Sequence, residues 1–377
     1  MQRNMYESIE QLTPESINVL TGSPLDFSHA LLRVVEKGLW GDLDVRYLTI
    51  ERDGRILAML PVYSGSNVNI NALMPKGLQN GIDRFVRSFG LAQRTSFCIA
   101  GNPISDKGWI PMAEDAAGPE LVAAMTGHVE QYASSLKVQL CLIKDIHDDF
   151  PADWKAAIER HGFQRTFSLP TVIVNTDFAS FDDYIAALKK NARKHARKTL
   201  RAAESLLEFE SIADYRHMID QVFPLLRGTY LKAKYQFDEG NPAFVQACSE
   251  VRDMGTELIV ARKNGQVVGA LINFFRDGEQ LNKRIGIDYR QEETPLIYTS
   301  LMYQGIRSAV ERGCKRVYLG QSTYVPKMRL GGWAEDMYFY VKPYDPLLKL
   351  MMPLSKRWSA DYMAHKVEAK ALEGISV

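Results

Sequence analysis

The chain has 377 residues, of which 46% are hydrophobic and 24% are charged, and its formal net charge is +1. This length suggests two domains, and this composition excludes a chain that is largely disordered. A net charge so close to zero also excludes a general electrostatic attraction to nucleic acid or to an anionic membrane. Binding to either would need a local patch of cations.

The first residues, MQRNMYESIEQLTPES, lack the apolar core of a signal peptide. No uninterrupted apolar run reaches the roughly 18 residues of a transmembrane helix. We therefore expect a cytoplasmic protein. The 4 cysteines have no C-x-x-C spacing and the 7 histidines have no spacing typical of metal ligands, so we expect buried thiols and no metal site.

Two β-hairpins are predicted, at residues 45–63 and 257–275, with turns at Asp53-Gly54 and Asn264-Gly265. Each hairpin is followed by a long helical pattern and a short β run, so the sequence predicts two copies of one α/β unit. We expect an α/β fold with two tandem domains, at 1–176 and 177–345, and in each a mostly antiparallel twisted sheet flanked by helices. The run 336–342 is expected to close the second domain. A C-terminal helical tail, 346–377, would pack on the second domain or, as an alternative, touch a membrane surface.

A strongly basic helix is predicted from Ser180 to about residue 205, with Ser180 and Asp183 in a capping-box arrangement. Between Tyr184 and Ala203 it contains no acid, and at about 100° per residue its cations share one face. These cations are Lys189, Lys190, Arg193, Lys194, Arg197, Lys198 and Arg201. Because like charges at this spacing repel one another, either acids from elsewhere in the fold neutralise the face or it binds a phosphate-bearing ligand. The sequence leaves both alternatives open.

A second helix is predicted at 295–312, with Thr294 as its N-cap, Pro295 in its first turn and Gly313 just past its end. Its N-terminus is a candidate site for an anion or a developing oxyanion, and the alternative is an ordinary helix start. A short strand at 316–319 then leads into the loop GQSTYVPKMRLGGW, which contains Gln321, Tyr324, Lys327 and Arg329. Lys327 is a candidate to stabilise an oxyanion, and the alternative is a surface lysine.

Three segments, ARKNGQVVGALI, PLIYTSLMYQGIRSAVERGCKRVYLG and STYVPKMRLGG, resemble the second domain of FemAB-like and related GNAT acyltransferases. The resemblance covers residues 165–345, and the first half by topology alone. It implies two tandem GNAT-like domains with the acyl-transfer site at or near the second. It also implies that Lys327 stabilises the oxyanion and that Arg193, Lys194, Arg197 and Arg201 contact phosphate. Thr294, at the predicted helix start, is a further candidate for binding the donor.

Two departures from the family pattern concern the site. Pro326 replaces the aromatic residue that precedes the lysine, and Tyr324 lies three positions ahead of Lys327. Residues 290–295 read RQEETP where relatives that use acetyl-CoA have Q/R-x-x-G-x-G/A. Ordinary CoA binding is therefore disfavoured, and a carrier-bound acyl group or an aminoacyl-tRNA is favoured.

The predicted function is N-acyl transfer from an activated donor to an amine on a small molecule or peptide, without a bound cofactor. The donor would be an acyl-CoA, an acyl-carrier protein or an aminoacyl-tRNA. Catalytic candidates are Lys327, Tyr324, Asp288 and Glu292, with Glu293 as a further candidate base, and acceptor-site candidates are Tyr289, Tyr298, Gln321 and Arg329. The alternative is a catalytically inactive adaptor that binds nucleic acid or phospholipid through residues 189–201.

Overall fold

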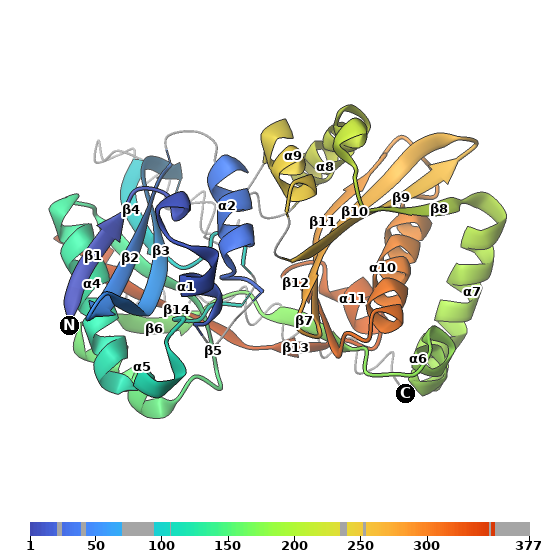
Figure 1. The fold of residues 1–377 in the computed structure, drawn as a ribbon. Helices are drawn as coiled ribbons and strands as arrows, with labels where there is room; N and C mark the ends of the chain where they lie inside the picture. Colours follow the sequence, from blue (N-terminus) through green and yellow to red (C-terminus); the bar gives the residue numbers. More distant parts are fainter. Residues whose placement is uncertain are drawn as a thin grey trace. The chain divides into compact units, whose positions relative to one another are not determined.

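The structure, a computed structural model, describes residues 1–20, 25–38, 43–69, 94–105, 107–233, 240–251, 254–346 and 348–350. Most of the expected helical tail lies outside the described residues. The chain forms two compact units, one of Met1–Leu169 with the segment that follows Glu335, the other of Pro170–Glu335 (Figure 1). Each unit contains a seven-stranded, mostly antiparallel sheet with helices, which confirms the expected fold class.

The described part of the chain has no helix that is both long enough and apolar enough to span a membrane.

The first unit has the strand order β1-β2-β3-β4-β5-β14-β6, and β4 and β5 are its parallel neighbours. Its strands are β1 (Gln2–Tyr6), β2 (Asp44–Arg52), β3 (Arg55–Asn69), β4 (Arg94–Ala100), β5 (Leu140–His147), β6 (Gln164–Phe167) and β14 (Met337–Pro343). Among its described residues the helices are η1 (Ile9–Gln11), α1 (Pro14–Asn18), α2 (His29–Gly38), η3 (Glu114–Ala116), α4 (Pro119–Ser135) and α5 (Ala152–Arg160).

The second unit repeats this arrangement with the order β13-β7-β12-β11-β10-β9-β8, and here β11 and β12 are parallel. Its strands are β7 (Thr171–Asn175), β8 (Glu208–Ile212), β9 (Gly255–Lys263), β10 (Gln266–Arg276), β11 (Glu279–Ile287), β12 (Arg316–Gly320) and β13 (Trp333–Glu335). Its helices are α6 (Phe181–Ala187), α7 (Lys190–Leu206), η4 (Arg216–Met218), α8 (Ile219–Lys232), α9 (Pro242–Ser249), α10 (Thr294–Glu311) and α11 (Tyr324–Arg329). Helix α10 packs on the sheet and α7 lies on the outer side of α10, while α8 and α9 contact the other face (Figure 1).

The predicted hairpin turns are confirmed. Asp53 and Gly54 have φ of 53° and 76°, and Asn264 and Gly265 have φ of 52° and 77°. Positive φ at both central residues is typical of the type I′ turn that joins twisted strands. A third turn of this kind, at Asp277 and Gly278, connects β10 to β11, so β9, β10 and β11 form a continuous meander.

The expected domain boundaries are wrong at two strands. Strand β7 precedes the boundary expected at residue 176, yet it pairs with β12 and β13 of the second sheet. Strand β14 was expected to close the second domain, yet it pairs with β5 and β6 of the first sheet. The alternation of residues in a strand shows which side chains share a face but not which strand is the partner. Each sheet is thus completed by a strand from beyond the expected boundary.

The expected basic helix is two helices, α6 and α7. Ser180 caps the first as predicted, since its side chain accepts a hydrogen bond from the backbone N–H of Asp183. The helix then breaks because Leu188 is extended, with φ of −62° and ψ of 146°, and its side chain is buried in an apolar cluster that includes residues of β12, α10 and α11. The break lets both helices bury their apolar faces.

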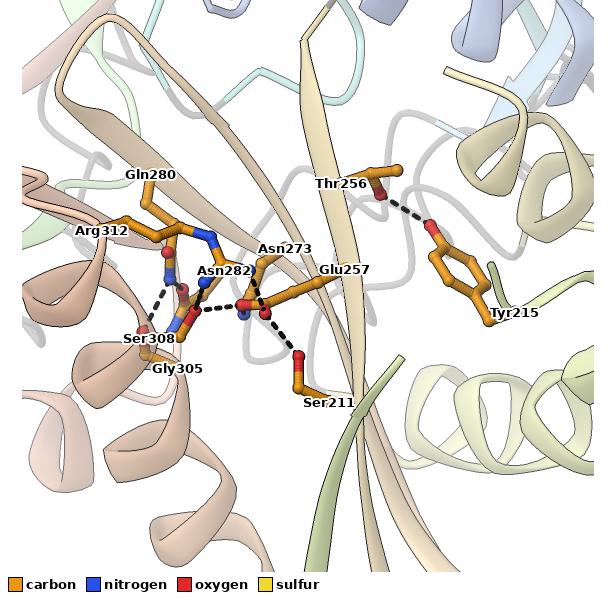
Figure 2. A network of polar contacts seen from close by, with 10 residues as sticks. All are labelled: Ser211, Tyr215, Thr256, Glu257, Asn273, Gln280, Asn282, Gly305, Ser308 and Arg312. Atoms are coloured by element: carbon orange, nitrogen blue, oxygen red, sulfur yellow. Dashed lines mark hydrogen bonds and ion pairs between the residues drawn. The ribbon is translucent and has the colours of Figure 1, made fainter. Parts of the chain in front are cut away.

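A buried carboxylate, Glu257, joins the sheet of the second unit to α10 (Figure 2). Its Oε1 accepts hydrogen bonds from Asn273 Nδ2, at 3.0 Å, and from Ser308 Oγ. Its Oε2 accepts from Ser211 Oγ and from the Arg312 guanidinium, each at 2.8 Å. One carboxylate therefore connects β8, β10 and α10, because buried charges are tolerated only when they are fully hydrogen-bonded.

A second polar contact lies beside this carboxylate (Figure 2). Gln280 Nε2 donates to the backbone oxygen of Gly305 and to Asn282 Oδ1, both at 2.8 Å. A Cβ atom on Gly305 would come within 2.5 Å of Asn282, so the close approach of α10 to β11 requires glycine here. Polar bonds as well as apolar packing thus set the position of α10.

We predict that Glu257→Ala lowers the free energy of unfolding by about 3 kcal/mol, because it leaves the partners of a buried charge without an acceptor. The control is Glu208→Ala, which removes an exposed carboxylate from β8 and should change stability by less than about 0.5 kcal/mol. Urea unfolding of both variants measures the difference. A loss for Glu257→Ala no larger than that of the control would show that the network does not hold α10.

Candidate functional site

The parallel strands β11 and β12 pair over a short stretch only, from Glu279 opposite Arg316 to Leu281 opposite Tyr318. Beyond it, β11 continues along β10, and β12 continues along β7. Among the described residues, no other segment pairs between the two diverging strands. We call this divergence the splay. In open α/β sheets, ligands bind where neighbouring strands part at their carboxyl ends.

The corresponding place in the first unit is closed by the chain itself. Strands β4 and β5 pair as far as Ala100 opposite Ile143. The segment 101–113 then bonds to both neighbours, with Gly108 N donating to Asp145 O at 2.8 Å and Met59 N donating to Pro111 O at 3.1 Å. The open splay therefore lies in the second unit.

The carboxyl end of β12 is a strained turn, residues 320–323. Gly320, Ser322 and Thr323 have φ of 77°, 62° and 51°, and positive φ is unfavourable for the two residues that are not glycine. Lys327 is 5% exposed, and its Nζ donates to the backbone oxygens of Gly320 at 3.1 Å and Gln321 at 2.8 Å. The lysine thus holds the turn in place.

Gln321, in the middle of this turn, has a buried side-chain nitrogen that finds no acceptor among the described residues. A buried N–H group without a partner is costly and is often explained by a ligand. Gln321 is therefore the member of the turn best placed to donate to a substrate atom.

Residues after the turn form the short helix α11 where the sequence predicted a loop. Tyr324 begins this helix and is buried, and its hydroxyl donates to the backbone oxygen of Pro170 at 3.0 Å. The predicted hydrogen-bond donor is thus engaged within the core of the unit. Pro326 is compatible with the first turn of a helix, where its missing N–H has no partner to lose.

The loop between β11 and α10, residues 288–293, contains the carboxylates predicted as bases. Asp288 accepts bonds from Arg290 Nε at 2.8 Å and Nη2 at 3.0 Å, and from Gln291 Nε2 at 3.2 Å. The bonds from Arg290 hold the pKa of the Asp288 carboxyl at about 2. Lys263 Nζ lies 2.8 and 2.7 Å from the two carboxylate oxygens of Glu293 and lowers its pKa. These two carboxylates are therefore weak bases, and Glu292, which is exposed, is the third candidate.

Helix α10 begins one residue earlier than expected. Thr294 is its first residue and not its N-cap, and the threonine Oγ1 donates to the backbone oxygen of Gln291 at 2.7 Å. The hydroxyl bonds to the preceding loop and so does not cap the helix. The predicted end is confirmed, since Gly313 has a φ of 70° directly after the helix.

The remaining acceptor-site candidates lie in different places. Tyr298, on α10, packs between the two apolar clusters of the second unit, and burial raises its pKa. Lys232 Nζ lies 4.2 Å from the centroid of the Tyr289 ring at the start of the loop. Arg329 ends α11, and its charge adds to partial burial in lowering the pKa of His195 on α7. Arg329 thus lies toward α7.

The candidates occupy two levels of the splay. Because Arg316 lies opposite Glu279, Gly320 is level with residue 283, where a bulge interrupts the pairing of β11 with β10. Ile287 ends β11 four residues farther on, about 13 Å along the strand. Gln321 and Lys327 are therefore deep in the splay, while Asp288, Glu292 and Thr294 are at its outer end. The structure does not bring Lys327 and Asp288 together.

Helix α7 packs on the unit through Ala196, Thr199 and Ala203 and exposes most of its cations. Arg193 is half-buried and donates to the backbone oxygen of Ala186. The exposed cations are Lys190, Lys194, Arg197, Lys198 and Arg201. Over the part of the chain that the structure describes, none of these side chains forms an ion pair with a carboxylate. Of the two alternatives left open by the sequence, binding of an external anion is the one that the geometry favours.

Two such sheets in tandem match the double GNAT fold. The structure of FemX has this fold, with a TM-score of 0.56, 13% identity and coverage of 82% of this chain and 90% of that one. L-PGS from Bacillus licheniformis has a TM-score of 0.52 at 12% identity, with coverage of 88% and 91%. At these identities the likeness shows the fold.

The family is shown by sequence. The model of the FemAB-like family, described as peptidoglycan biosynthesis/recognition, matches residues 105–329, more than half of the chain. The chain belongs to the FemAB-like family.

A curated relative, putative 8-amino-7-oxononanoate synthase 2 from Mycobacterium tuberculosis, is 20% identical over 256 residues. The match covers 66% of this chain and 32% of that protein. The chain thus spans about a third of the length of the curated relatives that it matches.

We predict that Gly108→Ala destabilises the first unit, because a Cβ there would lie 2.0 Å from the backbone oxygen of Lys144. A backbone clash of this kind should cost about 2 kcal/mol or more. Gly118→Ala is the control, because its Cβ would meet only the mobile carboxylate of Glu120, at 3.5 Å. Thermal unfolding of both variants tests the closure of the first sheet, and an equal melting temperature for the two would contradict it.

We predict that Asp288→Asn destabilises the protein at pH 7 but not in acid. The folded pKa of Asp288, about 2, lies below the ordinary value for aspartate, so its stabilising effect is present above about pH 4 and is lost as the pH falls toward 2. The urea midpoints of wild type and variant should differ at pH 7 and converge below pH 4. Asp177→Asn, at an exposed loop position, is the control and should show no such convergence.

Proposed function

We propose that the protein forms an amide at the splay of the second unit, by direct attack of an amine on the carbonyl carbon of an activated ester or thioester. The observation that carries this proposal is the unpartnered, buried side-chain nitrogen of Gln321 in the turn held by Lys327. Acyl transfer needs fixed donors directed at the oxygen that becomes negative in the transition state.

Gln321 and Lys327 have different roles in this mechanism. The side-chain amide of Gln321 donates a hydrogen bond to the carbonyl oxygen of the acyl substrate. This hydrogen bond becomes stronger as the tetrahedral intermediate forms and the oxygen becomes negative. Lys327 is a positioning residue, because its ammonium group bonds to the successive backbone oxygens of Gly320 and Gln321. The oxyanion role that the resemblance assigned to Lys327 passes to Gln321 in this proposal.

The remaining steps concern one proton and one leaving group. The nitrogen–carbon bond forms as the acceptor amine attacks, and the carbon–sulfur or carbon–oxygen bond of the donor then breaks. The amine proton passes to water, since Glu292 lies at the outer end of the splay and Asp288 and Glu293 are held ionised by Arg290 and Lys263. The departing thiolate or alkoxide takes up a proton, so charge and atoms balance.

The composition of the loop 288–293 indicates which class of acyl donor the protein uses in this proposal. The loop contains no glycine, and two of its three carboxylates, Asp288 and Glu293, are bonded to side chains of the protein. It therefore lacks the glycines that let backbone N–H groups surround a pyrophosphate. This favours an aminoacyl-tRNA or an acyl-carrier protein over free acyl-CoA as the donor.

The acceptor is proposed as an amine of a small molecule or peptide. The Mycobacterium tuberculosis relative is named for the synthesis of 8-amino-7-oxononanoate, a compound with an amine beside a ketone. An amino ketone therefore belongs in the first panel of acceptors, together with lysine-containing peptides.

The adaptor hypothesis is the second candidate, supported by the exposed cations of α7 that have no acidic partner among the described residues. It differs from the enzyme hypothesis in one measurement. Mass spectrometry of reactions with acyl-CoA, acyl-carrier protein and aminoacyl-tRNA should reveal an amide if the protein is a transferase. Binding of RNA or phospholipid without an amide from any donor would favour the adaptor.

We predict that Gln321→Leu lowers kcat about 100-fold or more, as removal of an oxyanion donor does in other acyl-transfer enzymes. Gln246→Leu, at an exposed position of α9, is the matched control and should leave kcat within twofold of wild type. Steady-state amide formation measures both. Full activity of Gln321→Leu would remove Gln321 from the mechanism.

A further inference from the structure

The exposed basic face of α7 is a short and sharply bounded surface. We define it by the five exposed cations Lys190, Lys194, Arg197, Lys198 and Arg201. From the first to the last of these residues the helix rises about 17 Å. The face stands out on a chain whose net charge is only +1.

Acids lie at both ends of this basic face. Asp182 and Asp183 are exposed in the first turn of α6, before it. Glu204 and Glu208 are exposed directly after it. A ligand that bears negative charge over a longer distance would meet these carboxylates and be repelled. The charges therefore match an anionic partner whose contact is about as long as three turns of helix.

Nucleic acid fits this surface poorly. Domains that bind nucleic acid are usually basic as a whole, and those that bind single-stranded RNA add aromatic side chains on which bases stack. Here the chain is close to neutral, and the basic face contains no aromatic residue. A small acidic protein, which can place one negatively charged helix against α7, fits both the length and the composition of the face.

A second, independent observation comes from the loop 288–293. It offers no glycine-lined site for the pyrophosphate of a free nucleotide donor. A donor that is anchored through a protein needs no such site, because the carrier supplies the binding surface. An acyl donor attached to a carrier protein would thus explain both the absence of glycine from the loop 288–293 and the presence of the basic face.

We propose that the basic face of α7 binds an acidic acyl-carrier protein, which presents its acyl group as a thioester to the splay. The inference rests on the proposed function and names its donor. The thioester carbon–sulfur bond breaks as the amide bond forms, and the carrier leaves with a free thiol that has taken up the proton. Cations at the rim of such an interface act mainly on the rate of association and its dependence on salt.

The test uses the full chain and a bacterial acyl-carrier protein loaded with a palmitoyl group. The test variant combines Lys194→Glu, Arg197→Glu and Arg201→Glu. The control variant makes the same change of charge at exposed positions elsewhere, with Arg52→Glu, Arg160→Glu and Lys315→Glu. The apparent KM for the acyl-carrier protein should rise at least tenfold in the test variant and less than twofold in the control. Circular dichroism and melting temperature establish that both variants are folded.

Further outcomes separate the proposed function from the docking of the carrier protein. Amide formation by wild type from palmitoyl-pantetheine, a thioester without a carrier, tests the proposed function by itself, and its absence with every donor would contradict that function. Turnover of the acyl-carrier protein with the same KM in test variant and wild type would overturn the docking inference alone. Binding of charged tRNA that is lost in the test variant, with no binding of the carrier, would overturn it in favour of RNA.

Discussion

The early end of the pairing between β11 and β12 leaves backbone polar groups that must find other partners. The second unit satisfies them with side chains. Thr229 Oγ1 accepts from the backbone N–H of Ile287 at 3.0 Å, and Lys327 donates to the backbone oxygens at the end of β12. The first unit satisfies them with backbone, through the segment that crosses at Gly108. The two sheets have the same strand order but differ where their parallel strands part. In the second unit side chains bond to the backbone groups there, and in the first unit a backbone segment does so.

The distribution of charge follows the same division. At the outer end of the splay, the acids Asp288 and Glu293 are each bonded to a neighbouring cation, which leaves Glu292 as the exposed carboxylate of the loop. On α7 the described carboxylates leave the exposed cations unpaired. A row of like charges on a helix costs stability, and a partner of opposite charge removes that cost. The turn with Gln321 and Lys327, which is held by hydrogen bonds, is thus distinct from the basic face of α7, whose exposed cations have no acidic partner among the described residues.

Features set by local chemistry could be predicted from the sequence. The turns at Asp53-Gly54 and Asn264-Gly265 follow from residues that tolerate positive φ, and α10 was placed to within one residue at each end. Features set by contacts between distant residues could not be predicted from the sequence. The break at Leu188 depends on its burial in a cluster formed by several elements, and the pairing of Lys263 with Glu293 joins residues 30 positions apart. The composition of the loop indicated Gln321 and Lys327 as candidate site residues. The sequence could not show which backbone oxygens Lys327 contacts, and those contacts are the basis for the different roles proposed for the two residues.

Strand β7 shows how strongly the site depends on such distant contacts. Gly320 pairs with Val172 of β7, and the Tyr324 hydroxyl bonds to Pro170 just before that strand. The turn that presents Gln321 is therefore supported on one side by residues that precede the boundary expected at 176. A second domain cut at that boundary would keep Gln321, Lys327 and the whole of α10, but it would lose the strand against which β12 and α11 are held. Strand β14 returns to the first sheet only after the turn has been made, so the first sheet, unlike the second, is completed by residues that follow the second unit.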